Sequence, residues 1–321
     1  SNVRFTWLPM KAAVRCAQDR NLRPKNNKPS PMTARVLSLC VDDFGQSPGI
    51  AAAVVQLAQA RRITAVTCIT NTPGWRRDAL LLREVMPTVA AGLHLNLTEG
   101  QPISAQLARA WPQLPSLPRL LVQTHLRMVP RQALVCEILA QWHAFAAACG
   151  RAPDFIDGHQ HVHHLPVVRD AMLEVLDGLQ VRPAVRSTAR VLGPAHAFKR
   201  WMIQATGGRA LERQLDQRQL PHNTVLLGAY DFRTTDYRAR MQAWLAGLPP
   251  QGGLLFCHPG LPEGLDAQDA IAPARGREWA YLSSAAFQQD LADAQVVLGN
   301  TCDRAAPKMA VAAVSEMSRS G

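Results

Sequence analysis

Residues 36–45 read VLSLCVDDFG, an apolar run that ends abruptly in two adjacent carboxylates, Asp42 and Asp43. The apolar part predicts a buried strand from Val36 to Val41, and Pro48 then opens a predicted helix that continues to Arg61. Further short apolar runs predict strands at 63–69, 89–97, 155–157, 184–187, 225–227, 254–257 and 295–298. Repeated strand–helix units predict an α/β fold with a parallel sheet and helices outside it.

The segments between these strands are mostly helical in pattern. Pro130 begins a long predicted helix that ends near Gly150, with proline at the first turn and glycine beyond the last. The stretch 191–220 also has a helical composition, whereas the proline-rich stretch 102–118 is expected to be a loop over the site. The remaining helices are predicted at 76–85, 166–179, 235–248 and 284–292.

Polar side chains stand at the ends of four predicted strands that are far apart in the sequence. Asp42 and Asp43 follow the first, His94 interrupts the strand 89–97, the segment DGHQHVHH at 157–164 follows the short strand 155–157, and His258 follows 254–257. Singly, each has a structural explanation, because Asp43 could cap a helix and His258 could serve a turn. Together they favour a barrel over an open sheet, since a barrel brings its strand ends round one rim.

Four histidines and an aspartate within 157–164 indicate a metal site, because imidazole is the commonest nitrogen ligand of zinc. Not all four histidines can be ligands. If the segment is extended, alternate residues share a face, so His159, His161 and His163 would point one way and His164 the other.

Four strings in this order, VDDFGQSPG at 41–49, GLHLNLTEG at 92–100, DGHQHVH at 157–163 and CHPG at 257–260, resemble the motifs of YdjC-like carbohydrate deacetylases. That family includes chitooligosaccharide deacetylases and deacetylases associated with hopanoid biosynthesis. Weaker matches are VRS at 185–187, REW at 277–279 and VLG at 297–299, so the resemblance runs from about residue 33 to residue 300. It implies an irregular (β/α) barrel, like a TIM barrel but with fewer than eight regular strands.

The resemblance also implies the ligands and the reaction. Asp43, His94 and His159 match the family's metal ligands, and one carboxylate with two imidazoles leaves open positions, as catalytic sites do. We expect one divalent ion, magnesium or zinc, because this ligand set tolerates several metals. The implied reaction is hydrolysis of the N-acetyl group of an acetylated amino sugar or short oligosaccharide, chitooligosaccharide-like or lipid-linked, by metal-activated water.

Other polar residues are then expected to assist. Asp42 is predicted to take the proton of the water, His258 to protonate the leaving nitrogen, and Arg186 to hold Asp42 ionised and oriented. The remaining residues are expected to contact the ligands or the substrate: Asp157 by orienting an imidazole, together with His161 and His163. Trp75, Trp111, Trp279 and Tyr281 could offer ring faces to a sugar, although packing in the core is the commoner role of any one tryptophan.

Three other functions use some of the same residues. A metal-dependent phosphoesterase could use these ligands, although the sequence has no glycine-rich loop that would cradle a phosphate. A non-catalytic protein that binds metal or sugar is a second alternative. A third is a nucleophilic Cys257 with His258 beside it, but this would leave the aspartate and histidine clusters without a role.

Composition suits one large catalytic domain, at 321 residues and 47% hydrophobic content. Residues 1–31 carry seven basic residues and one acidic residue, a net +6 of the chain's +11. We therefore expect a basic, flexible N-terminal extension at 1–31, a catalytic domain at 32–303 and a tail at 304–321. No nucleic-acid partner is expected, because no base-reading module accompanies the basic segment.

Cysteine usage and hydropathy bear on the location of the protein. The seven cysteines are odd in number and form no Cys-x-x-Cys pair, which predicts reduced thiols in the cytoplasm. No apolar stretch reaches the roughly 18 residues that a membrane span needs. The sequence leaves a homodimer open.

Overall fold

Residues 34–300 are described by the computed structural model of the chain. The predicted extension at 1–31, the tail at 304–321 and the domain boundaries between them and 32–303 lie outside the described residues. The strands of the described part are β1 (Arg35–Phe44), β2 (Ala65–Cys68), β3 (Ala90–Leu95), β4 (Phe155–Gly158), β5 (Ala184–Val185), β6 (Leu226–Leu227), β7 (Gly253–Cys257) and β8 (Val296–Leu298).

All strand pairs in this part of the chain are parallel, in the order β5-β4-β3-β2-β1-β7-β6, and β8 pairs with the start of β1. The edge strands β5 and β6 share no ladder. Their segments are linked instead by single parallel bridges, between Val185 and His222 and between Val191 and Leu226. The result is an irregular barrel with seven strands on its path, as predicted from the sequence.

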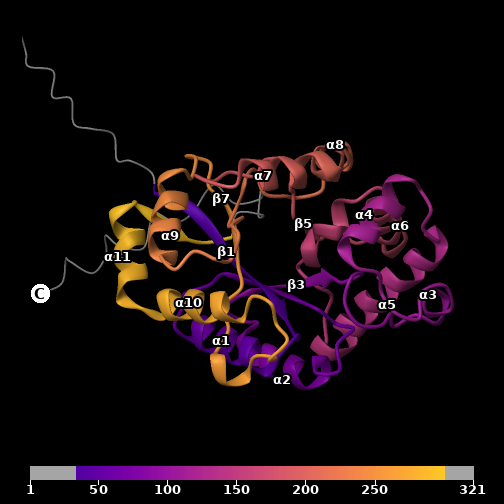
Figure 1. The fold of residues 1–321 in the computed structure, drawn as a ribbon, viewed down its shortest axis with the longest axis horizontal. Coiled ribbons are helices and arrows are strands. Elements are labelled where there is room, and N and C mark those ends of the chain that lie inside the picture. Colours follow the sequence, from indigo (N-terminus) through magenta and orange to yellow (C-terminus); the bar gives the residue numbers. More distant parts are fainter. Residues whose placement is uncertain (1–33, 301–321) are drawn as a thin grey trace, which may run out of the picture. The chain divides into compact units, whose positions relative to one another are not determined.

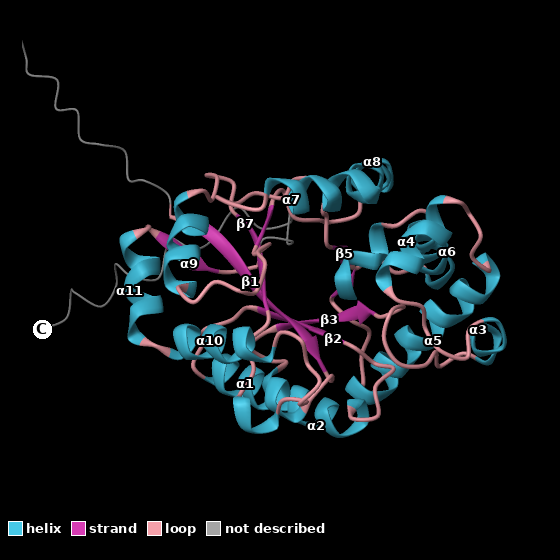
Figure 2. Cartoon of the chain, in the orientation of Figure 1, coloured by secondary structure: helices cyan, strands magenta, loops and turns pink. Residues whose placement is uncertain are grey.

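Helices surround these strands (Figures 1 and 2). They are α1 (Pro48–Gln59), α2 (Trp75–Val85), α3 (Ala105–Ala110), α4 (Leu117–His125), α5 (Arg131–Cys149), α6 (Val168–Leu179), α7 (Ala197–Ile203), α8 (Arg209–Arg218), α9 (Tyr237–Ala246), α10 (Ala272–Ser283) and α11 (Ala285–Asp293), with the short helices η1 (His159–His164), η2 (Gln204–Gly208) and η3 (Pro262–Gly264). No helix within residues 34–300 is long and apolar enough to cross a membrane.

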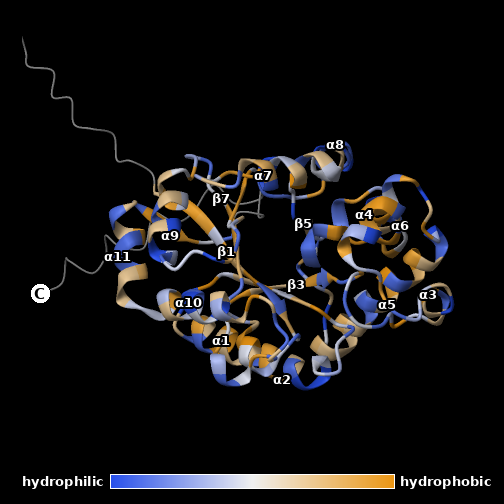
Figure 3. Ribbon diagram, viewed as in Figure 1, coloured by the Kyte–Doolittle hydropathy of each residue, from blue (hydrophilic) through white to orange (hydrophobic). Residues whose placement is uncertain are grey.

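The core is centred on β1, which pairs with three other strands and is buried from Leu37 onward. Figure 3 shows β1 as a largely hydrophobic ribbon. A parallel strand covered on both faces needs a nearly continuous apolar sequence, which explains why the run 36–41 was recognisable as a strand. Its carboxyl end, where the sequence turns acidic, leads into the site.

Two segments differ from the sequence-based prediction. The proline-rich stretch 102–118 is not a plain loop, because α3 lies within it and α4 begins at its end; the hydroxyl of Ser104 caps α3 by accepting from the amide of Leu107. Helix α10 was not predicted at all. Its buried residues include charged ones, Arg275 and Glu278, so the apolar periodicity that marks an ordinary amphipathic helix is missing.

Strand β3 approaches β4 closely at Gly92, which pairs in register with Phe155. A Cβ on Gly92 would lie 2.4 Å from the Phe155 ring, so the buried ring or one of the two strands would have to move. We expect Gly92→Ala to lower the free energy of unfolding by about 1–3 kcal/mol, measured by urea denaturation.

Gly178→Ala on α6 is the matched control, because a Cβ there has nothing within 4 Å. It should leave stability unchanged or raise it by about 0.5–1 kcal/mol, since alanine is the better helix former. Equal stability of both variants would contradict the tight approach of β3 to β4.

Candidate metal centre

A pocket of about 670 Å³ opens at the carboxyl ends of the strands. Its polar lining includes five of the predicted metal and catalytic residues and one further histidine of the 157–164 segment: Asp42, Asp43, His94, His159, His161 and His258. The first two come from β1, His94 comes from β3, His159 and His161 follow β4, and His258 follows β7. The barrel therefore brings together residues that are up to 216 positions apart in the sequence.

The end of β1 is distorted in a way that turns both of its carboxylates into the pocket. Consecutive residues of a regular strand point to opposite faces, yet Asp42 and Asp43 both line the cavity. The register between β1 and β2 shifts between Val41 and Phe44, and Asp43 has a φ of 67°, in the left-handed region. Such a bulge re-aims side chains at a site. Asp43 is not the cap of α1; Ser47 is.

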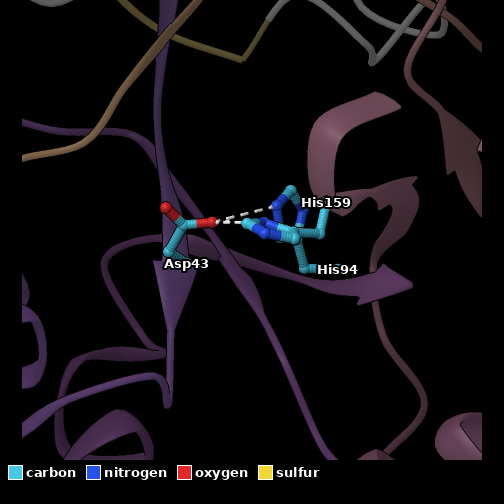
Figure 4. A group of neighbouring side chains, drawn as sticks. All are labelled: Asp43, His94 and His159. Carbon is cyan, nitrogen blue, oxygen red and sulfur yellow. Dashed lines mark hydrogen bonds and ion pairs between the residues drawn. The ribbon is translucent and has the colours of Figure 1, made fainter. Parts of the chain in front are cut away.

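Asp43, His94 and His159 meet around one carboxylate oxygen (Figure 4). Oδ1 of Asp43 lies 2.9 Å from Nδ1 of His159 and 3.4 Å from Nε2 of His94, and all three side chains are buried. Zinc–ligand bonds of 2.0–2.1 Å place neighbouring donors of a tetrahedral site roughly 3.3 Å apart. The donor types and their spacing therefore fit a divalent metal.

Asp157 holds His94 through Nδ1, the ring nitrogen that does not face Asp43. Nδ1 of His94 lies 2.7 Å from Oδ1 of Asp157, and the same oxygen accepts a hydrogen bond of 2.6 Å from the hydroxyl of Thr67. When Nδ1 donates to this carboxylate, the lone pair of neutral His94 is on Nε2, which faces Asp43. Asp157 thus lies where the sequence placed it, beside an imidazole.

Arg186 lies between two buried carboxylates. Its guanidinium donates to both oxygens of Asp42, at 2.7 and 2.6 Å, and Nη2 is also 2.6 Å from Oδ2 of Asp157. Burial alone would raise the pKa of Asp157, but Arg186 and His94 lower it to about 2. The bidentate contact fixes the orientation of the Asp42 carboxylate, which is 3% exposed at the pocket.

Arg275 and Glu99 belong to the same centre, although the sequence analysis did not single them out. Nη2 of Arg275 lies 2.8 Å from Oδ2 of Asp43 and so occupies the oxygen that does not meet the imidazoles. Oε1 of Glu99 lies 3.0 Å from Nε2 of His159. Glu99 stands inside the string 92–100, which held the signal for it, whereas Arg275 stands two residues before REW and outside every motif.

Acidic neighbours raise the pKa of both imidazoles. Burial alone would lower the pKa of His94, but Asp157 and Asp43 raise it to about 9. In the same way burial opposes protonation of His159, while Asp43 and Glu99 raise its pKa to about 10. In the metal-free protein these raised pKa values favour the imidazolium form of both rings at neutral pH, where they face the carboxylates of Asp43, Asp157 and Glu99.

The histidine segment is not extended, so the prediction about its faces is wrong. Residues 159–164 form η1, and Gln160 and His161 have φ values of 53° and 62°, which reverse the chain locally. His159, His161 and His164 line the pocket as a result. His163 lies behind them, where Nε2 donates to the backbone oxygen of Arg186 at 2.9 Å and burial lowers its pKa to about 4.

His258 is held by its backbone and by aromatic rings. Its amide donates to Oε2 of Glu278 at 2.5 Å, and Glu278 also accepts from the hydroxyl of Tyr230. The imidazole meets the rings of Phe232 and Phe256 edge-on, at centroid distances of 5.1 and 5.6 Å. Burial lowers the pKa of His258 to about 4, so the ring is neutral at pH 7 before substrate binds.

Two alternatives raised by the sequence, aromatic rings for a sugar and a nucleophilic cysteine, are not supported. None of Trp75, Trp111, Trp279 and Tyr281 lines the pocket, and they pack in or against the core instead; the rings that do line it are Phe232 and Phe256. Cys257 is buried and its thiol donates to the backbone oxygen of Cys40, 3.5 Å away. Burial raises the pKa of this thiol well above its usual value, which argues against a nucleophilic cysteine.

Residues 36–293 match the model of a protein family described as YdjC-like protein. A chitooligosaccharide deacetylase of Proteus mirabilis is 33% identical over 137 residues, which are 40% of this chain and 51% of that protein. A chitooligosaccharide deacetylase of Klebsiella pneumoniae is 25% identical over 278 residues, 84% of this chain and 99% of that protein. The match thus spans about half the length of the first relative and nearly all of the second.

A solved structure from Enterococcus faecalis, described under the name of a cellobiose-phosphate cleavage protein, has the same fold. It superposes with a TM-score of 0.64 and 20% sequence identity over 84% of this chain and 98% of that chain. The irregular (β/α) barrel expected from the sequence is therefore also the fold of a solved protein.

Metal binding should be strongly pH-dependent. Metal ligands must be deprotonated, and the pKa values of His94 and His159 are raised to about 9 and about 10. Zinc affinity should therefore rise with pH up to that range, and binding at pH 7 should release about two protons, counted by calorimetry in buffers of different ionisation enthalpy.

His159→Ala should abolish this binding, whereas His143→Gln, which changes an exposed histidine on α5, should leave affinity and proton release unchanged. Zinc affinity that does not vary with pH between 6 and 9 would show that the two imidazoles are not ligands.

Proposed function

Because the chain belongs to the YdjC-like protein family, we propose that it is a metal-dependent hydrolase that removes the N-acetyl group from an acetylated amino sugar or a short oligosaccharide. The observation that carries this proposal is the buried Asp43–His94–His159 set, with the Arg186-bound carboxylate of Asp42 beside it in one pocket. Relatives named as chitooligosaccharide deacetylases support the choice of reaction and substrate.

In this proposal Asp43, His94 and His159 hold one divalent ion. The bound ion supplies Lewis-acid chemistry, because it polarises an acyl oxygen and lowers the pKa of water. Its identity is left between zinc and magnesium, since a carboxylate with two imidazoles accepts either and geometry and availability decide. Arg275 keeps the second oxygen of Asp43 engaged, so that Oδ1 alone faces the imidazoles.

Asp42 is the proposed proton acceptor for the attacking water. It is adjacent in sequence to a proposed ligand and lines the same pocket. Both of its oxygens accept hydrogen bonds from Arg186, so Asp42 is not part of the proposed donor set. Arg186 and Asp157 act as positioning residues, because the guanidinium orients Asp42 while Asp157 orients both Arg186 and His94. A fixed acceptor avoids reorganisation during the reaction.

His258 is the proposed proton donor to the leaving nitrogen. Its pKa of about 4 in the free protein means that it is neutral at pH 7, so it can donate only after it has gained a proton during turnover. The proton that Asp42 takes from the water is the one available to His258, and the negative charge that develops on the substrate oxygen favours the imidazolium form of this ring. His161 also lines the pocket and is a proposed substrate contact. His163, which lies outside the lining, is proposed only to support Arg186.

We further propose that the protein works in the cytoplasm. Its five described cysteines are free thiols, as is usual in a reducing compartment.

The proposal is tested by acetate release from a panel of N-acetylated mono- and oligosaccharides. Chelated enzyme should be inactive, and zinc or magnesium should restore acetate release from at least one member. Phosphate release from sugar phosphates, measured in parallel, should be absent; phosphate without acetate would point to the phosphoesterase alternative. Metal and sugar binding without any turnover would point to a binding protein.

Asp42→Asn separates metal binding from catalysis. The variant should bind metal like the wild type, because its three donors are intact, and should lose roughly 10²–10⁴-fold in the rate of acetate release. Asp170→Asn on α6 is the matched control, since Asp170 also pairs with a neighbouring arginine but does not line the pocket. Full turnover in Asp42→Asn would remove Asp42 as the proton acceptor.

A further inference from the structure

Most of the exposed large hydrophobic residues of the described chain lie on or just after two helices at the pocket. Of the nine large hydrophobic residues that are exposed within 34–300, five lie on α4, directly after it, or on α7. They are Val122, Leu126, Met128, Phe198 and Trp201, with exposed fractions of 54–73%. No residue of α7 is buried, although five of its seven residues are apolar. Exposed apolar clusters of this kind mark interaction sites.

This surface is continuous with the lining of the pocket. Leu117 and Leu121 line the cavity from α4, and Val122, next in sequence to Leu121, and Leu126, just beyond the helix, are exposed. Met202 and Ile203 face the cavity from α7, where Phe198 lies one turn before Met202 and stacks on Trp201 at 5.9 Å. Apolar side chains therefore extend from the pocket lining to the outside of the protein at both helices. We call the five exposed residues Val122, Leu126, Met128, Phe198 and Trp201 the rim.

Basic residues outnumber acidic ones around the rim, where the nearest acidic group to α7 is Asp231, 3.9 Å from His196. Residues 100–136, which include α4, contain four arginines and no aspartate or glutamate. Residues 178–211, which include α7, contain five arginines and one lysine, again without an acidic residue. Lys199 and Arg200 stand between the two exposed rings of α7, and Arg119 and Arg127 flank the exposed residues of α4.

Aromatic and aliphatic side chains together with an excess of basic ones are the composition of surfaces that lie on anionic membranes. Tryptophan in particular favours the boundary between lipid headgroups and acyl chains. We propose that the rim docks on an anionic lipid surface, with the mouth of the pocket facing the lipid. If the proposed function holds, the acetylated sugar is then carried on a lipid whose apolar part leaves the pocket between α4 and α7.

The test uses the full chain and vesicles of equal amounts of phosphatidylglycerol and phosphatidylcholine. Phe198→Ala combined with Trp201→Ala should weaken co-sedimentation by at least about tenfold. Leu80→Ala combined with Leu81→Ala is the control, because these exposed leucines lie on α2, which does not line the pocket. It should bind like the wild type, and binding to pure phosphatidylcholine should be much weaker for all proteins.

The basic segment 1–31 can itself attract anionic lipid, so a second readout is needed. Lipids brominated in their acyl chains quench nearby tryptophan, and Trp201 is the only one of the described tryptophans classed as exposed. Trp201→Phe should remove most of the quenching, whereas Trp7→Phe, in the basic segment, should not. Quenching that persists in Trp201→Phe and disappears in Trp7→Phe would overturn the proposal.

Two more measurements separate the remaining outcomes. If the rim variants turn a dimer into a monomer and leave vesicle binding unchanged, a second copy of the chain covers the rim and the proposal is wrong. Acetate release from a soluble substrate should be unchanged in the rim variants, because neither ring lines the pocket. If the wild-type protein binds vesicles as expected but releases no acetate from any substrate, the proposed function is wrong and the proposed docking surface is still supported.

Discussion

The carboxylate of Asp157 joins the two halves of the site. It is fully buried and contacts Arg186 on one oxygen and His94 and Thr67 on the other. Through Arg186 it reaches Asp42, and through His94 it reaches Asp43, so charges of opposite sign alternate along the chain of contacts. Buried charges are tolerated only when they are paired, and loss of one partner leaves another unpaired. The proposed proton acceptor and the proposed metal donors therefore depend on one side chain.

This network also explains why the fold has to be a parallel barrel at this end. Its members come from β1, β2, β3, β4 and the segment after β5, each at or near the carboxyl end of a strand. Parallel neighbours place these ends at one rim, which strands running in alternate directions would not do. The bulge in β1 is also needed to assemble the network, because it turns the consecutive carboxylates of Asp42 and Asp43 to the same side. The positive φ of Asp43 is conformational strain at the site itself.

The pocket has two chemically different sides. The polar side holds the carboxylates and imidazoles, whereas α4, α7, Phe232 and Phe256 provide an apolar side. The polar side suits a hydrated amide and its reaction, and it accounts for the proposed deacetylation. A free sugar is too polar to make many favourable contacts with the apolar side, which continues out of the pocket onto the rim. In the two proposals this division gives one site two tasks, chemistry at the strand ends and recognition of the rest of the substrate at the helices.

The sequence alone determined the strand–helix order and the parallel sheet, because apolar runs that end in polar residues such as Asp42 and Asp43 are visible without the structure. The proposed metal donors Asp43, His94 and His159 came from the resemblance of the motifs to those of a known family. The sequence also indicated Arg186 and Asp157, which the structure joins in one ion pair. Only the tertiary structure decided which histidines of 157–164 face the pocket, because left-handed residues in η1 replace the strand alternation on which the prediction relied. It alone revealed Arg275 and α10, since a helix that buries charged residues has no apolar period to read. Local patterns report what a segment buries, but the partner of a buried charge comes from another strand or helix, and only the folded chain brings the two together.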